Sequence, residues 1–564
     1  SEYVQLDLSK KQSLISPKLP QYCGGLPVAY LLASVLEIGK NCVIGNRCIL
    51  GGNNILHDNS GLNCLSMLPA DLKISSGEFW GGSPAVLLRS YTPPEPSNNG
   101  FGTLNIILLS FLVFLFPAAM EALFFPGLII FEEYSSYSES LYAWFLISPF
   151  LALAFILLLL TVTAVSNRLL LFGIKEGKYE LNSFFYIRYW LFSQISKYSI
   201  NVCSTIFATI YSRLWFKAAG VSVGKNAEIS YVSGLIPGLT DIGEGCFLAD
   251  DAMIGMPVVN GGSFLLSKTS IGDKTFIGNS ALVPIGSTIP GGCLIGVQSR
   301  PPENKNIEAG SSWLGSPAIF LPVRQKSDNF SEELIFRPPA KMVMLRYFIE
   351  FFKAVTPLSV FIMLACIILN KTESLFEAGW SFMEVLALCP IMYIFSGFFC
   401  MILIVILKWI LIGRFHEERN PLWSVKVWIS EFIVGIYENL AVLLFIEPLC
   451  GTPFIGSCLR ILGSKIGWRC YINTPYLTEF DLISIGDESE INDSAILQTH
   501  LFEDRVMKCG RIEIGKRATI GAETIILYDV KIDDDTQVGD NSLIMKGETL
   551  PAGTKWHGIP GKNC

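Results

Sequence analysis

The sequence predicts a mixed membrane protein in which three left-handed parallel β-helix units, the first of them partial, alternate with two α-helical transmembrane units. Three observations lead to this fold class: long apolar segments, an apolar residue at every sixth position of the polar regions, and the recurrence of both features along the chain. The predicted units are residues 1–97 (partial β-helix 1), 98–217 (transmembrane unit 1), 218–325 (β-helix 2), 326–460 (transmembrane unit 2) and 461–564 (β-helix 3).

The composition is that of a membrane protein with sizeable polar regions. Of the 564 residues, 51% are hydrophobic and 16% are charged. The net charge of −7 and the lack of a Lys/Arg-rich run argue against a nucleic-acid partner. The 15 cysteines are scattered with no CxxC pair, so we expect reduced, mostly buried thiols and no metal site.

Four segments are apolar over the roughly 20 residues that a bilayer span needs. They are residues 104–130, 141–165, 342–369 and 383–412. Residues 184–215 and 427–454 carry charges and fit either a span that lines an interior or an interfacial amphipathic helix. The hairpin loops are acidic and the opposite ends basic, so the positive-inside rule places the β-helix units on the cytoplasmic face, or its equivalent.

The six-residue period is clearest near the C-terminus. It runs through Ile514, Ile520, Ile526, Ile532, Val538 and Ile544. In a parallel β-helix each hexapeptide forms one flat side of a triangular coil, and its apolar residue points inward. Intervals of 13 residues (Ile472 to Ile485) and 17 residues (Leu497 to Ile514) break the period, so we expect a loop to leave the coil at each.

The middle of the chain repeats this pattern. Ile242 and Ile485 are equivalent at an offset of 243 residues (485 − 242), and the same offset relates the closing motifs WLGSP and WHGIP. A third copy begins near Ile38 and closes in WGGSP, but its first rungs are missing. We therefore expect either a longer natural protein or another polypeptide that completes the first β-helix. Three copies in one chain could also form internally the trimer that β-helix acyltransferases often make.

The 17-residue break of the last copy carries an unusual group of ionisable side chains. The middle copy has Pro257 opposite His500 and no charge opposite those of LFEDRVMK, whereas Asp493 has the counterpart Asp250. Because the middle copy builds its coil without this group, we expect chemistry here, with His500 as a general base oriented by Asp493 or Glu503. The candidate substrate-binding residues are Gln498, Thr499, Asp504, Arg505 and Lys508. The alternative is a loop whose charges bridge to its own coil or to lipid headgroups.

Four long motifs carry a family resemblance. They are CGTPFIGSCLRILGSKIG, NTPYLTEFDLISIGDESEINDSAILQTHLFEDRVMK, LIMKGETLPAGTKWHGIP and WLGSPAIFLPVR. They resemble the C-terminal membrane region of ε-poly-L-lysine synthetase and its relatives, which are nonribosomal peptide synthetases. The resemblance implies six transmembrane helices, three tandem soluble domains, and amide-bond formation from an amino acid held on a carrier domain as a phosphopantetheine thioester. It also implies that His500, in the QTH motif, acts as base for an amine that attacks this thioester.

We therefore expect a membrane-embedded aminoacyl or acyl transferase that forms amide bonds. The sequence shows neither an adenylation domain nor a carrier-type serine motif, so the thioester would come from other domains or another chain. Coenzyme A is the other candidate donor, and no cofactor is expected to be bound in this chain. Membrane lipid and a larger complex or oligomer are the expected partners. The alternative is a non-catalytic accessory subunit that retains the fold.

Overall fold

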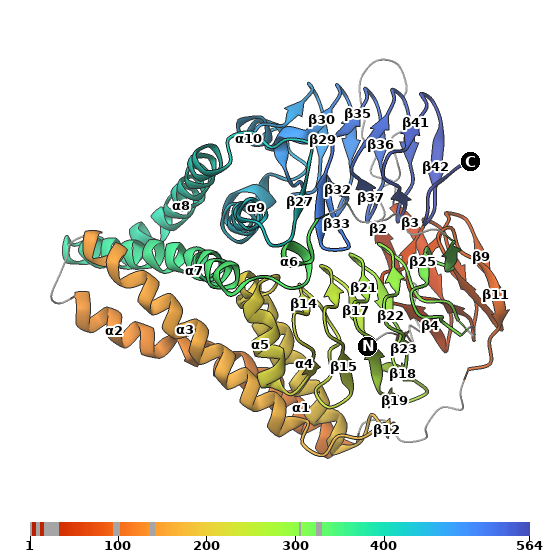
Figure 1. Cartoon of the computed structure of the whole chain (residues 1–564). Helices are drawn as coiled ribbons and strands as arrows, with labels where there is room; N and C mark the ends of the chain where they lie inside the picture. Colours follow the sequence, from red (N-terminus) through yellow and green to blue (C-terminus); the bar gives the residue numbers. More distant parts are fainter. Residues whose placement is uncertain are drawn as a thin grey trace.

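The computed structural model describes residues 3–6, 12–15, 33–93, 102–135, 141–303, 306–322 and 330–564. Over these residues, short parallel strands form three coils that lie together on one side of the molecule, while long helices fan out on the other side (Figure 1). Coils and helical units alternate along the chain. The chain is therefore a membrane protein with β-helix units, as the apolar segments and the repeats predict.

The third coil shows how the six-residue period folds. Ile514, Ile520 and Ile526 are 3% exposed or less, and the strand of each pairs in parallel with the strand one turn further along the chain. Polar residues with positive φ turn the corners at the same spacing, for example Asp529 and Asp535. Stacking these turns buries one continuous apolar column, which removes a large apolar area from water.

The strands have the following bounds. In the first coil they are β1 (Tyr3–Leu6), β2 (Gln12–Ile15), β3 (Ala33–Ile38), β4 (Cys42–Gly45), β5 (Ile49–Leu50), β6 (Ile55–Leu56), β7 (Gly61–Leu62), β8 (Met67–Leu68), β9 (Lys73–Ile74), β10 (Glu78–Gly81) and β11 (Val86–Ser90). In the second they are β13 (Ser222–Val223), β14 (Glu228–Ile229), β15 (Thr240–Ile242), β16 (Phe247–Leu248), β17 (Met253–Ile254), β20 (Thr269–Ile271), β21 (Phe276–Ile277), β22 (Leu282–Val283), β23 (Thr288–Ile289), β24 (Leu294–Ile295), β25 (Ser312–Leu314) and β26 (Ile319–Leu321). In the third they are β28 (Lys465–Ile466), β29 (Tyr471–Ile472), β30 (Ile483–Ile485), β31 (Glu490–Ile491), β32 (Ile496–Gln498), β35 (Ile512–Ile514), β36 (Thr519–Ile520), β37 (Ile525–Leu527), β38 (Val530–Ile532), β39 (Gln537–Val538), β40 (Leu543–Ile544), β41 (Thr549–Leu550), β42 (Lys555–His557) and β43 (Lys562–Asn563).

Each 17-residue break forms a β-hairpin that leaves the coil. In the third coil the hairpin consists of β33 (His500–Glu503) and β34 (Val506–Cys509), and in the second of β18 (Val258–Asn260) and β19 (Ser263–Leu266). A strand of the preceding membrane unit joins each hairpin: β27 (Glu418–Pro421) pairs with β34, and β12 (Gly177–Glu180) with β19. The loops predicted at these breaks are therefore ordered elements tied to the membrane units.

The helices fall into two groups. The first group is α1 (Thr103–Glu121), η1 (Ala122–Phe124), α2 (Phe125–Ser135), α3 (Leu141–Leu170), α4 (Phe184–Val202), η2 (Ser204–Ile206) and α5 (Ile210–Ala219). The second is α6 (Glu332–Ile335), α7 (Ala340–Glu377), α8 (Phe382–Leu411), α9 (Val425–Ile436), the π-helix η3 (Tyr437–Ile446), η4 (Glu447–Leu449) and α10 (Ile455–Leu462), and η5 (Phe480–Leu482) lies within the third coil. Helix α3 packs against α7, which joins the two groups.

Five helices in the described ranges are long and apolar enough to span a membrane. They are Thr103–Ile130, Ala143–Leu170, Glu332–Glu377, Phe382–Leu411 and Val425–Leu449. They include the four clear segments of the sequence and one of the two charged segments. The other charged segment, residues 184–215, is interrupted after Val202 and continues as the short helix α5, so it is not one long helix. By length and composition, the described residues thus contain five of the six expected spans, and the sixth stays an expectation.

The three coils meet in a ring at their closing motifs. The backbone N–H of Ser83 donates to the carbonyl of Ser316 (3.2 Å), that of Ser316 to Ile559 (3.4 Å), and that of Ile559 back to Ser83 (3.2 Å). Each bond joins the same position of two successive copies, so the described parts of the coils are related by a pseudo-threefold axis. One chain thus forms internally the kind of ring that a trimer forms from three chains.

Close backbone packing in this ring gives a first prediction. At Gly315 an added Cβ would lie 2.6 Å from the carbonyl oxygen of Ile559, whereas at Gly310 it would meet nothing within 4 Å; both glycines have positive φ. We expect Gly310→Ala to lower the stability of the fold by only about 1–2 kcal/mol, the cost of placing a non-glycine residue in the left-handed backbone conformation. Gly315→Ala should lose clearly more, because the coils must also move apart. Thermal unfolding of the two variants checks this, and equal losses would contradict a tight ring.

Candidate active site

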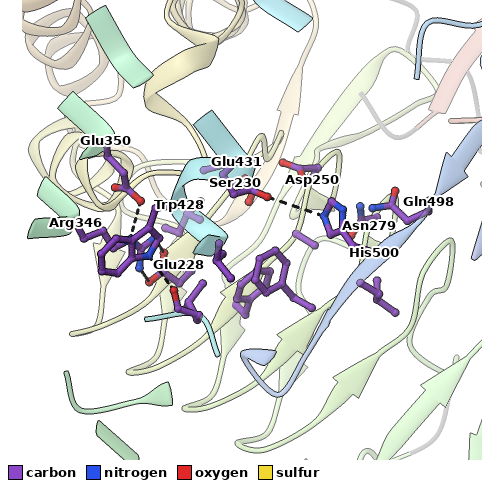
Figure 2. A pocket seen from close by; sticks show the side chains of 18 residues that line it. Glu228, Ser230, Asp250, Asn279, Arg346, Glu350, Trp428, Glu431, Gln498 and His500 are labelled. Carbon is purple, nitrogen blue, oxygen red and sulfur yellow. Dashed lines mark hydrogen bonds and ion pairs between the residues drawn. The ribbon is translucent and has the colours of Figure 1, made fainter. Parts of the chain in front are cut away.

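A cavity lies where the second coil, the third coil and the membrane helices meet. The second coil contributes Asp250 and Asn279, and the third contributes His500 (Figure 2). Helix α7 closes one end with Arg346 and Glu350, and helix α9 contributes Trp428 and Glu431. The cavity volume is about 50 Å³, which is enough for a small group of a few water-sized atoms.

The imidazole of His500 is held by a buried carboxylate. Nδ1 of His500 lies 2.8 Å from Oε2 of Glu479, and Glu479 is only 1% exposed. The hydroxyl of Thr499 donates to the same carboxylate oxygen at 2.6 Å, and that of Ser430 to Oε1 at 3.4 Å. With Nδ1–H donating to Glu479, Nε2 is the nitrogen that faces the remaining carboxylates of the cavity.

The surrounding charges decide the ionisation of His500. Burial alone would lower the pKa of the imidazole, but the carboxylates of Glu479, Glu431 and Asp250 together raise it to about 9. The pKa of Glu479 shifts in the opposite direction. Burial would raise it, but the adjacent imidazolium and the hydrogen bonds that Glu479 accepts hold it below its usual value. At neutral pH the pair is therefore an imidazolium facing a carboxylate.

The wall opposite Nε2 is acidic. Oε1 of Glu431 lies 4.0 Å from Nε2 of His500 (Figure 2). The other oxygen of Glu431 is 3.4 Å from Nζ of Lys353. Asp250 accepts a hydrogen bond from the backbone N–H of Tyr231 at 3.4 Å. Desolvation raises the pKa of Asp250, and the neighbouring Glu431 carboxylate raises it further. The site thus has more carboxylates than its one lysine can balance, and this favours a cationic ligand.

The other end of the cavity is a saturated ion network. Arg346 donates to both carboxylate oxygens of Glu228 (2.8 and 2.9 Å) and through Nε to Glu350 (2.6 Å). The second oxygen of Glu350 accepts from the backbone N–H of Ile210 at 2.7 Å. Burial would raise the pKa of Glu228, but the Arg346 guanidinium holds it below its usual value. This network joins α7 to the second coil and to the start of α5, so we assign it a structural role.

The His500 hairpin is formed by its turn. Asp504 and Arg505 have φ of 49° and 65°, and two successive positive φ values are the mark of a type I′ hairpin turn. The second coil uses Gly261 and Gly262, with φ of 56° and 76°, at the same place. The fold therefore needs the turn geometry in both copies, whereas the side chains on the hairpin are free to differ.

The structure brings only some of the predicted site residues to the cavity. Gln498 and His500 line it. Thr499 is fully buried behind them and holds Glu479. Glu503 instead forms ion pairs with Lys508 (2.9 Å) and Lys546, and accepts from the hydroxyl of Tyr528.

The remaining predicted residues serve other contacts. Arg505 donates to the carbonyls of Asn226 and Cys246, so it ties the hairpin to the second coil. Asp504 occupies the hairpin turn. Asp493 is exposed and accepts from Ser494 Oγ at 3.3 Å. In the structure the carboxylate of Glu479, rather than that of Asp493 or Glu503, contacts Nδ1 of His500.

Three carboxylates of the site were missed by sequence reasoning. Glu479 lies in the 13-residue break of the third copy, a signal that was present but not used. Asp250 is the counterpart of the predicted Asp493 at the 243-residue offset, so it occupies the same position in the neighbouring copy. The reason is the ring: the hairpin of one coil faces a rung of its neighbour. Glu431 comes from a membrane helix and had no repeat to mark it.

Metal binding has no support in the described ranges, where no group of three or more His, Cys, Asp and Glu side chains could hold an ion.

No family model matches the chain. Two solved structures are similar only at TM-scores too low to support an argument. They are a hexapeptide-repeat acetyltransferase from Vibrio cholerae (TM-score 0.18, 19% identity, 20% of this chain and 77% of that one) and an N-acyltransferase from Bacillus cereus with dTDP and coenzyme A (TM-score 0.14, 11% identity, 63% and 90%).

The informative comparison is with a relative whose chain is much longer. The sequence is 33% identical over 519 residues to delta-poly-L-ornithine synthetase of Acinetobacter baumannii. The match covers 88% of this chain and 38% of that protein, so this chain corresponds to well under half of its relative. The comparison supports likeness to a poly-amino-acid synthetase, whereas likeness to an ε-polylysine enzyme in particular stays an expectation.

Proposed function

We propose that the chain is the amide-forming, membrane-embedded acyltransferase part of a poly-amino-acid synthetase, with His500 as the general base. The observation that carries this is the imidazole held by Glu479, with its second nitrogen facing a cavity lined by Asp250 and Glu431. The relative named for poly-ornithine synthesis supports a basic amino acid as substrate. The acidic wall is where its cationic amine would bind.

The chemistry requires one proton transfer and one group transfer. The acceptor amine nitrogen attacks the thioester carbonyl carbon; a C–N bond forms, the C–S bond breaks and a thiolate leaves. Nε2 of His500 takes the proton that the amine loses and returns it to the thiolate, so no proton is gained or lost. Glu479 stabilises the imidazolium formed between these steps, and Gln498, which also lines the cavity, contacts the substrate.

The thioester donor lies outside this chain in our proposal. A phosphopantetheine arm on a carrier domain would bring the activated amino acid, and an adenylation domain would load it. A coenzyme A thioester is the second candidate donor. We place the coils on the cytoplasmic side, where such domains would have access, because the acidic hairpin loops and basic opposite ends of the membrane helices favour that orientation.

The direct test supplies the donor chemically. The purified full chain is mixed with the pantetheine or coenzyme A thioester of ornithine and an ornithine acceptor, and amide products are followed by mass spectrometry. We expect amide formation above the rate without protein. If neither donor yields product with a folded chain, the proposal fails and the alternative, a non-catalytic accessory subunit, takes its place.

The acidic wall gives a second prediction. Asp250→Asn should raise the KM of a cationic acceptor about tenfold, because a hydrogen-bonded charge contact contributes about 1.5–3 kcal/mol. A neutral amine of the same length should be affected much less. Asp493→Asn is the matched control, since Asp493 occupies the equivalent position of the third coil and lies outside the cavity lining. Equal KM changes in the two variants would contradict the assignment of Asp250.

A further inference from the structure

A long apolar groove runs between α3, α5 and α7, away from the candidate active site. Its volume is about 500 Å³, within the roughly 300–1,000 Å³ typical of ligand sites. Along α3 the lining residues recur at three- and four-residue spacing from Leu153 to Arg168, so one face of this helix forms the wall. Ile156 and Trp215 are buried in the floor, whereas Leu157 and Leu214 are 56% and 47% exposed at the rim.

The groove is longer than one bilayer leaflet is thick. Leu153 and Arg168 are 15 residues apart (168 − 153), which corresponds to about 22 Å along a helix. The hydrocarbon core of a bilayer is about 30 Å thick, so one leaflet contributes about 15 Å. An acyl chain in the outer part of the groove would therefore reach from the interface to the bilayer midplane, and the groove continues beyond that depth.

The interfacial end of the groove is basic. Arg168 lies in the last turn of α3 and Lys217 in the last turn of α5, and both are exposed. Nε of Arg168 donates to the carbonyl of Ala218 at 2.6 Å, and Nη2 to that of Lys217 at 3.2 Å. These bonds fix the guanidinium at the mouth of the groove, against the backbone of the last turn of α5, which carries Lys217. Two cations at headgroup level, above an apolar channel, are complementary to an anionic lipid.

We propose that this groove binds one acyl chain of an anionic phospholipid, whose headgroup phosphate is bound by Arg168 and Lys217. The bound chain lies between α5 and α7 and covers the exposed rim of Leu157 and Leu214. The two helices also contact each other directly, because the hydroxyl of Tyr211 donates to the carbonyl of Tyr347 at 2.8 Å. The lipid thus adds apolar contact to the joint that carries Arg346 and Glu350.

Lipid retention tests this proposal without any catalytic assay, and so independently of the proposed function. The full chain is equilibrated with equal amounts of phosphatidylglycerol and phosphatidylcholine of the same acyl chains and passed into lipid-free detergent. Retained lipid per protein is then measured by mass spectrometry. We expect the native chain to retain phosphatidylglycerol in preference to phosphatidylcholine.

Two pairs of variants separate the groove from the headgroup contact. Leu157→Trp fills the groove and should reduce retention of both lipids, whereas Leu146→Trp, on the same helix outside the groove, should not. Lys217→Gln should reduce phosphatidylglycerol retention about fivefold, since one cation near the surface contributes about 1 kcal/mol. The exposed Lys197→Gln should leave it unchanged. Equal retention by the native chain and Leu157→Trp overturns the groove site, and equal retention of both lipids by the native chain overturns the headgroup assignment.

Discussion

Replacing His500 by glutamine is expected to lower the rate of amide formation by about 10²–10⁴-fold, the usual contribution of a general base. Glutamine keeps a hydrogen-bonding side chain beside Glu479 but cannot accept the proton of the attacking amine. The binding of the cationic acceptor should not weaken, because the acidic residues Asp250 and Glu431 remain and the competing imidazolium charge is gone. The loss should therefore appear in kcat rather than in KM.

Single-turnover amide formation from a preformed ornithine thioester measures this effect without contributions from activation or loading. His416→Gln is the matched control, because His416 is exposed and lies outside the cavity lining. Thermal unfolding of each variant shows whether the chain remains folded. A folded His500→Gln variant with native kcat would contradict the role of His500 as base.

Arg346→Met is expected to destabilise the protein by about 3–5 kcal/mol, because it removes the cation that directly hydrogen-bonds two buried carboxylates. Glu228 and Glu350 are both buried, and Arg346 provides charged contacts to each. The loss should appear as a lower unfolding temperature and as loosening between α7 and the second coil. Activity should then fall as a consequence of the structural change.

Neutralising the whole network is the control for this effect. The triple variant Arg346→Met, Glu228→Gln, Glu350→Gln removes the unpaired charges and should recover much of the lost stability. Protease accessibility near α7 reports the same loosening independently. If the single variant is as stable as the native chain, the network does not hold α7 to the coil.

Local repeats made most of the fold predictable. Each inward-pointing position, such as Ile514 or Ile520, is decided by its own hexapeptide, so the period alone predicts the coil. The long apolar segments predicted the membrane helices for the same reason. Residues 184–215 were harder, because a break after Val202 is decided by packing against neighbouring elements rather than by hydropathy.

The candidate site was predictable only in part, because it lies between copies. His500 was singled out by comparing one copy with another, and Gln498 follows it into the cavity. Glu479, which contacts His500, belongs to a different loop of the third coil, and Asp250 belongs to the second coil. No periodicity within a single copy indicates which rung of a neighbour will face a hairpin. The ring of closing motifs supplies that information, and only the folded chain shows it.

The pH dependence of amide formation in the native chain and in Glu479→Gln tests the role of the His500–Glu479 pair most directly. The base form of His500 is the active one, so kcat/KM should rise with pH, with a midpoint near the pKa of about 9 and a plateau only above it. Glu479→Gln removes the carboxylate that does most to raise this pKa, so the midpoint should move to lower pH while the plateau rate falls. Both proteins are assayed with the same donor and the same acceptor. Ionisation of the substrate then affects the two pH profiles equally, and any difference between them comes from the protein. Superimposable profiles, or a native rate that does not change between pH 6 and 9, would contradict the account.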